Sequence, residues 1–135
     1  MYMNYDYEGI ESLKGHEITE AWINDDKTLL ILKGKERDFS FYCEGDCCSE
    51  SWIEHIHIPF NFGVIEEIKH KFMDGLIGTR QESDRVYSYE FSFKGNKYDI
   101  FAIEFRNSSN GYYGGALSLL KTKPDGTFKK VEESF

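Results

Sequence analysis

The sequence has few of the residues that mark linkers, disulfide scaffolds or membrane spans. It contains 2 prolines among 135 residues, which excludes Pro-rich linkers and stalks. No apolar run approaches the roughly 18 residues of a transmembrane helix. The N-terminal residues lack the charged and apolar parts of a signal peptide. Three cysteines are too few for a disulfide scaffold. These absences predict a cytoplasmic protein, not bound to a membrane, whose cysteines are reduced.

Basic residues are in the minority. The chain has 16 Lys and Arg against 24 Asp and Glu, which gives a net charge of −8. A general nucleic-acid binder presents a basic patch, so the sequence argues against direct nucleic-acid binding. An acidic protein of this kind is compatible with a partner that is itself basic, although charge of this size also serves solubility alone. The oligomeric state stays open.

Apolar and aromatic residues, in contrast, are plentiful. Hydrophobic residues make up 40% of the chain and aromatic residues 16%, enough for a real core in a chain of this length. We therefore predict a single domain over residues 1–135. Residues 1–15 have no clean period and are read as an N-terminal arm or a short lead-in.

The first half of the chain alternates like a β-meander. Strands are predicted at 17–23, 28–32 and 39–43, separated by polar turns at 24–26 and 34–38. The second strand is continuously apolar, as expected of a strand that is covered on both faces.

A hairpin is predicted in the second half, with strands at 85–93 and 98–106 around a turn centred on Gly95 and Asn96. That turn would place Phe93 opposite Tyr98 and Phe91 opposite Ile100. The second strand is apolar on both sides, which favours a central position in a sheet. A strong last strand is predicted at 116–121, and a weak edge strand at 127–131.

Two segments between these strands are less regular. Residues 64–73 fit both a helical and a strand period, and the β-rich surroundings favour a strand. Ser51 and Glu54 fit a capping box for a short helix that ends before Pro59. The predicted class is thus mainly β (α+β): an antiparallel meander sheet, partly open barrel or sandwich-like, with one short helix after the cysteine corner.

The cysteine corner, residues 44–52, is the most distinctive run in the sequence. It lies close to two histidines, so a zinc site has to be considered; its weak candidate ligands are Cys43, Cys47, Cys48, His55 and His57. The spacing departs from the paired Cys-x-x-Cys pattern of structural zinc sites. Buried free cysteines also serve readily as small core residues. We therefore predict neither a metal nor another cofactor.

A thiol nucleophile is the second interpretation of the corner, with His55 as its base. Glu44, Asp46, Glu50 and Glu54 surround the thiols with negative charge, which raises a thiol pKa and opposes activation. A purely structural interpretation accounts for most of these residues: a turn at Gly45, small cysteines in a tight space and Trp52 against the end of the sheet.

The glycine-rich segment 107–115 is the second candidate region. Its glycines permit close backbone approach to a ligand, and Tyr112 and Tyr113 could stack on a base or ring. A bent connection with two surface tyrosines explains the segment equally well. It lacks the Gly-Lys-Ser/Thr ending of a phosphate loop.

The two regions together resemble a family of small proteins of unknown function found mainly in bacteriophages and in bacteria carrying prophages. The resemblance rests on a Gly-Asp-Cys-Cys-Ser-x-Ser-Trp block at 45–52 and an Asn-Gly-Tyr-Tyr-Gly-Gly block at 110–115. It spans residues 13–120 and implies no catalytic residue.

The resemblance implies a non-enzymatic phage-type accessory protein, an inhibitor of a host defence system that binds a host protein or a small signalling nucleotide. The alternative is a metal- or thiol-dependent enzyme centred on Cys47, Cys48 and His55. The candidate binding residues are Glu44, Asp46, Cys47, Cys48, Ser49, Trp52, Asn110, Gly111, Tyr112 and Tyr113.

Overall fold

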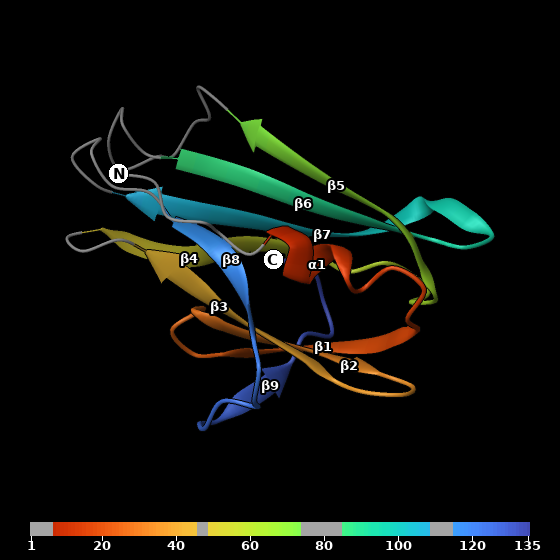
Figure 1. Cartoon of the computed structure of the whole chain (residues 1–135), viewed down its shortest axis with the longest axis horizontal. Helices are drawn as coiled ribbons and strands as arrows, with labels where there is room; N and C mark the ends of the chain where they lie inside the picture. The colour runs from red at the N-terminus through yellow and green to blue at the C-terminus, as the bar shows by residue number, and fades with distance from the viewer. Residues whose placement is uncertain (1–6, 46–48, 74–84, 109–114) are drawn as a thin grey trace.

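The computed structural model describes residues 7–45, 49–73, 85–108 and 115–135, and these form two antiparallel sheets that face each other (Figure 1). The first sheet has the strand order β8-β3-β2-β1-β9 and the second the order β4-β7-β6-β5. The mainly β class is confirmed, in its sandwich-like form. Among the described residues no helix is long and apolar enough to cross a membrane.

The predicted meander forms the middle of the first sheet. It consists of β1 (Ile18–Asn24), β2 (Leu29–Gly34) and β3 (Phe39–Gly45). The side chain of Asn24 holds the β1–β2 turn, because its Oδ1 accepts hydrogen bonds from the amides of Thr28 and Leu29, both at 2.9 Å. β2 is central in this sheet. Its residues Leu30 and Leu32 belong to the core, and Ile31, which points to the opposite face, is buried as well. Both faces of this strand are therefore covered, as predicted.

The remaining two strands of this sheet form its edges. β8 (Gly115–Leu120) pairs with β3, and the short β9 (Phe128–Lys130) pairs with β1. The predictions of both strands are confirmed, and β9 is an edge strand as expected.

The second sheet contains β4 (Glu50–His57), β5 (Ile65–Met73), β6 (Arg85–Phe93) and β7 (Asn96–Ser108). The prediction of a strand at 64–73 is confirmed by β5. β7 lies between β4 and β6, which confirms the central position that its apolar faces predicted.

The helix predicted after the cysteine corner is wrong, because these residues form β4 and pair with β7. A bulge between Ile53 and His55 adds one residue to β4. Ile53 and Ile56 therefore both point into the core although they are three residues apart. One face of a helix produces the same apolar spacing, so the bulged strand imitates a helix in the sequence.

The register predicted for the β6–β7 hairpin is also wrong. Phe93 pairs with Asn96 and Phe91 with Phe101, with a shift in register between them. A shift by one residue reverses the faces of a strand. Consequently Phe101 lies in the core, whereas Tyr98, expected opposite Phe93 on the aromatic face, is 91% exposed.

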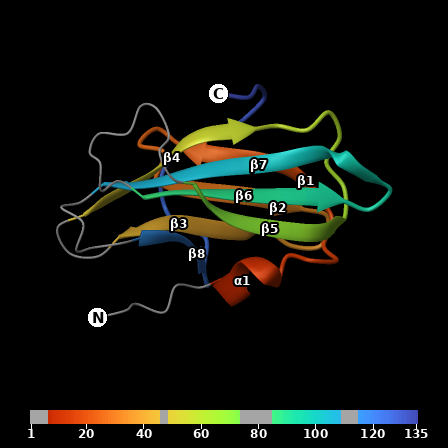
Figure 2. The same ribbon diagram turned by 90° about the horizontal axis from the view of Figure 1, so that it is seen from above.

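The helix among the described residues is α1 (Tyr7–Glu11), which precedes the first strand, within the segment predicted as an arm. Seen from above, α1 lies beside β5 and β8, at the side where the two sheets have their edges (Figure 2). Ile10 and Leu13 are 1% and 0% exposed and belong to the core, so this segment closes that side of the sandwich.

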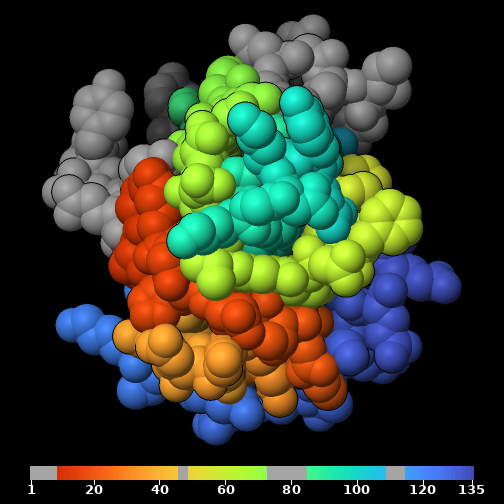
Figure 3. Space-filling view, turned by 90° about the vertical axis from the view of Figure 1, so that its right-hand side faces the viewer, coloured from red at the N-terminus to blue at the C-terminus, as the bar shows by residue number. Residues whose placement is uncertain are grey.

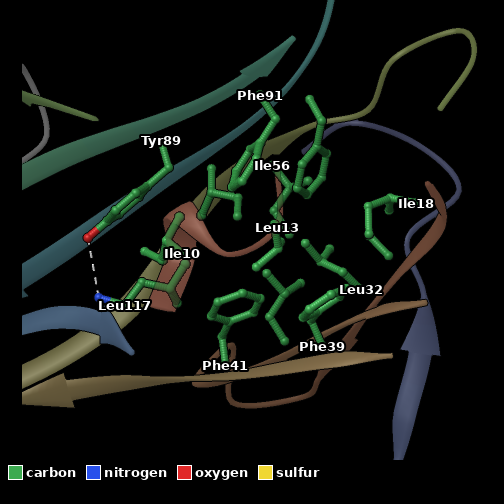
Figure 4. Close-up of a cluster of buried hydrophobic side chains, with 14 of the residues drawn as sticks. Ile10, Leu13, Ile18, Leu32, Phe39, Phe41, Ile56, Tyr89, Phe91 and Leu117 are labelled. Carbon is green, nitrogen blue, oxygen red and sulfur yellow. Dashed lines mark hydrogen bonds between the residues drawn. The ribbon is translucent and has the colours of Figure 1, made fainter. Parts of the chain in front are cut away.

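The core between the sheets is rich in aromatic rings (Figure 4). Phe39 and Phe41 from the first sheet face Tyr89 and Phe91 from the second. The hydroxyl of Tyr89 accepts a hydrogen bond of 3.3 Å from the amide of Leu117, which gives this buried polar group a partner and joins the second sheet to β8.

Candidate functional site

The flanks of the two sequence blocks meet at one end of the sandwich, on the left in Figure 1. Gly45 at the end of β3 pairs with Gly115 at the start of β8, and Glu50 at the start of β4 pairs with Ser108 at the end of β7. Segments that lie far apart in the sequence therefore share one end of the molecule.

A polar cluster that we call the Asn107 clasp, comprising Glu44, Ser49, Ser51 and Asn107, joins the two sheets at this end. The side-chain amide of the fully buried Asn107 donates to the hydroxyls of Ser49 and Ser51, at 3.1 and 2.8 Å. Ser51 in turn donates to the backbone carbonyl of Glu44 at 3.1 Å. The hydroxyl predicted to cap a helix instead bridges β4 to β3.

The clasp leaves no room for a side chain at Gly115. A Cβ there would lie 2.3 Å from the carbonyl oxygen of Glu44 and 2.5 Å from the hydroxyl oxygen of Ser51. Close approach of backbone and hydroxyl groups, and not a turn, is thus what requires glycine at this position.

The described candidate binding residues have structural partners in this region. The carboxylate of Glu44 accepts a hydrogen bond of 2.6 Å from Ser118, and Ser49 belongs to the clasp. Trp52 lies on β4 and donates from its indole to Glu54 at 2.5 Å. The other candidates lie outside the described residues: Asp46, Cys47, Cys48, Asn110, Gly111, Tyr112 and Tyr113.

The described metal candidates lie on both sheets, and Cys47 and Cys48 lie outside the described residues. Cys43 on β3 packs against the core, and burial raises the pKa of its thiol to about 12. His55 on the exposed surface of β4 lies 3.8 Å from the carboxylate of Glu104, and His57 is exposed further along β4. In the described part of the chain, no three His, Cys, Asp or Glu side chains come together as metal ligands. An enzyme centred on Cys47, Cys48 and His55 stays a sequence-based prediction.

A small apolar cavity of about 80 Å³ lies between α1, β5, β6 and the start of β8. His70 lies at this cavity and stacks on Tyr89, with ring centroids 4.6 Å apart. Burial lowers the pKa of the His70 imidazole. Pockets for small molecules usually have volumes of about 300–1,000 Å³, so this cavity is far too small for a nucleotide.

The opposite end of the sandwich carries a surface that the sequence reasoning missed. A shallow groove of about 850 Å³ is lined by residues 57–61, by the β6–β7 hairpin and by the C-terminal residues Glu132 and Ser134. Phe60 and Tyr98 line it and are 96% and 91% exposed. Figure 3 looks onto this end, where the cyan hairpin and the yellow-green loop before β5 lie side by side. We call this surface the aromatic groove.

The backbone beneath the exposed ring of Phe60 is held in place. The carboxylate of Asp99 accepts hydrogen bonds from the amides of Phe60 and Asn61, both at 2.8 Å. Phe62 in the same loop packs against the rings of Phe93 and Phe101, with centroids 6.1 and 5.6 Å away. The loop is therefore anchored at two points while Phe60 projects outward.

Two sequence signals bear on this groove. Phe60 follows Pro59 and precedes Asn61, which is turn chemistry around an aromatic residue and could have revealed it. Tyr98, in contrast, is expected on the aromatic face because the predicted turn is centred on Gly95 and Asn96, whereas the structure has the turn at Lys94 and Gly95.

Comparisons with known proteins identify relatives of this chain. The model of the domain of unknown function DUF7448 matches residues 11–119. The chain belongs to the DUF7448 family. An uncharacterised protein of Acanthamoeba polyphaga mimivirus is similar to this DUF7448 protein, with 30% identity over 110 residues that cover 76% of this chain and 86% of the viral protein. No solved structure matches the chain.

Proposed function

We propose that this DUF7448 protein is a non-enzymatic binding protein that acts through the aromatic groove. The observation that carries the proposal is the pair of aromatic side chains, Phe60 and Tyr98, that are almost fully exposed at the rim of one groove. Burying a Phe side chain stabilises a protein by about 1.5–3 kcal/mol relative to leaving it exposed. An exposed ring does not contribute this free energy to folding, but it can contribute it to binding when a partner covers the ring. Aromatic residues are also the side chains on which binding energy at interfaces is concentrated.

The hydrogen-bonded backbone of the groove supports the same proposal. Binding costs conformational entropy when a loop has to be ordered, and the cost is smaller when the loop is held beforehand. Asp99 holds the Phe60 loop through two hydrogen bonds, and the amide of Lys94 ties the hairpin to the same region through a bond of 2.8 Å to the carbonyl of Val64.

The viral relative supports an accessory role in infection. A protein similar to this chain occurs in Acanthamoeba polyphaga mimivirus. A small acidic binding protein encoded by a virus is suited to occupying a host component and keeping it from its own partners. We therefore propose, as the finer form of this function, that the protein inhibits a host defence system in the cytoplasm of the infected cell.

The experiment compares three forms of the protein in cells that carry a defence system able to stop a chosen virus. Wild type is expected to raise the virus yield, and the double variant F60A/Y98A is expected to lose this effect. F72A is the matched control, because Phe72 is a half-exposed aromatic residue on β5 that lies outside the groove. Equal yields with wild type and F60A/Y98A, at equal protein levels, would contradict the proposal.

A second measurement separates a protein partner from a signalling nucleotide. A ligand that binds the folded state raises its melting temperature, so a nucleotide sponge would be stabilised by its nucleotide. We expect no shift with a panel of cyclic mono- and dinucleotides. A shift with one of them that F60A/Y98A retains would assign the binding role to another surface.

A further inference from the structure

The aromatic groove is acidic as well as aromatic. Its lining includes the carboxylates of Asp99 and Glu132 and the imidazole of His57, and among the described residues that line it there is neither Lys nor Arg. The carboxylate of Asp99 accepts two backbone hydrogen bonds but has about four acceptor positions, so it can accept further bonds from a partner. The groove therefore combines exposed aromatic rings with carboxylate oxygens that can accept further hydrogen bonds.

The charge of the whole chain has the same sign. A net charge of −8 attracts cationic partners over long distances and repels anionic ones. An Arg side chain suits this combination in particular, because its guanidinium can stack on an aromatic ring and pair with a carboxylate at the same time.

We propose that the aromatic groove binds a basic segment of a partner protein. An apolar side chain of that segment lies between Phe60 and Tyr98, and neighbouring Arg or Lys side chains pair with Asp99 and Glu132. This inference rests on the proposed binding function and adds the chemistry of the partner.

Two other occupants fit the groove less well. The phosphates of a nucleotide would face Asp99 and Glu132 with no Lys or Arg in the described lining to neutralise them. A second copy of the chain would bring the acidic groove against an equally acidic protein, and a two-fold symmetric contact would bring the groove against itself.

The test is a selection of random displayed peptides of about 12 residues, long enough to extend over about 40 Å. Peptides are selected on immobilised wild-type protein after depletion on F60A/Y98A. We expect the enriched peptides to share an apolar residue flanked by Arg or Lys. Enrichment of acidic or uncharged peptides would overturn the basic chemistry but leave the binding function standing. Failure to enrich any peptide over F60A/Y98A would count against both.

A matched pair of charge variants tests the electrostatic part on one enriched peptide. E132K reverses a charge in the groove, and E36K makes the same change at an exposed position in the turn between β2 and β3. We expect E132K to weaken binding by about tenfold, which is about 1.4 kcal/mol, and E36K to change it much less. Equal effects of the two variants would show that only the net charge matters, and would overturn the assignment to Glu132.

Measurement of the oligomeric state tests whether a second copy of the chain occupies the groove. Light scattering on wild type and F60A/Y98A is expected to give the same mass for both. A wild-type dimer that F60A/Y98A converts to a monomer would make a second copy the occupant and would overturn the proposal.

Discussion

At the scale of single residues, Asp99 and Phe60 illustrate how the fold presents a side chain to solvent. Asp99 follows Tyr98 in β7, and its carboxylate accepts hydrogen bonds from the backbone amides of Phe60 and Asn61. Asp99 therefore links the two exposed rings. Tyr98 is its neighbour in the chain, and the backbone of Phe60 is hydrogen-bonded to its carboxylate. Hydrogen bonds to a charged acceptor are worth about 1.5–3 kcal/mol, enough to keep a short loop in one conformation.

Substitution of Asp99 should release the Phe60 loop. In D99A, we expect the amides of Phe60 and Asn61 to lose their protection against hydrogen exchange, because both lose their acceptor. Amide exchange followed by NMR measures this directly, and the amide of Ile58 is an internal control because its acceptor is Ser134. Unchanged exchange at Phe60 and Asn61 would mean that Asp99 does not hold the loop.

Cys43 is the residue for which burial gives a clear chemical expectation. The thiol packs against the core, and its pKa is raised from 9.0 to about 12, so it stays protonated at neutral pH. Because the thiolate is the reactive form, Cys43 should resist alkylation in the folded protein and react in denaturant.

The measurement uses a variant in which Cys47 and Cys48 are replaced by Ser, which leaves Cys43 as the last of the three cysteines. Iodoacetamide at mildly alkaline pH is expected to modify it in urea but not under native conditions. Rapid native alkylation, with the fold intact by circular dichroism, would contradict the burial of this thiol.

At the scale of elements, the Asn107 clasp fixes how β3, β4, β7 and β8 meet. Its hydrogen bonds link β3 of the first sheet to β4 and β7 of the second, at the end where the flanks of the sequence blocks meet. The fit is tight at Gly115, where a methyl group would meet backbone and hydroxyl oxygens.

We expect G115A to destabilise the protein by about 1–3 kcal/mol, the usual cost of overpacking a well-packed site. G63A is the matched control, because its new Cβ would have Phe93 Cβ as nearest neighbour at 3.5 Å, an ordinary contact. Urea denaturation of both variants gives the two free energies of unfolding. A loss for G115A no greater than that for G63A would show that the clasp tolerates a side chain.

The elements were largely predictable from the sequence, and the two errors both lie where strand pairing is irregular. Alternation of apolar residues identified the meander, the hairpin and the last strands correctly. The bulge after Ile53 breaks this alternation and imitated a helix. In the hairpin, the turn lies at Lys94 and Gly95, one residue earlier than predicted, and the pairing is irregular between Phe91 and Phe93. Tyr98 is therefore on the surface and not on the predicted aromatic face. The candidate site was affected more than the fold, because the second error concealed half of the aromatic groove.

At the scale of the whole molecule, the described residues share one hydrophobic core. It draws on both sheets and on the segment that contains Ile10 and Leu13. Elements that share a core unfold together, so we predict a single cooperative transition in which circular dichroism and tryptophan fluorescence coincide. The two tryptophans report on both sheets, since Trp22 lies on β1 and Trp52 on β4. Separate transitions for the two probes would contradict the prediction of a single domain over residues 1–135.

The two ends of the molecule differ in structure. The flanks of the sequence blocks meet at one end, where the described residues form the Asn107 clasp, and the aromatic groove lies at the other. We propose that the groove provides the contact with the partner.

The most direct measurement of that claim is the affinity of the purified partner, once identified, for wild type, F72A and F60A/Y98A by calorimetric titration. We predict equal affinities for wild type and F72A, and a loss of at least about tenfold for F60A/Y98A, since truncation of an aromatic residue at a binding hot spot costs about 2 kcal/mol or more. Equal affinities for all three proteins would contradict the proposal.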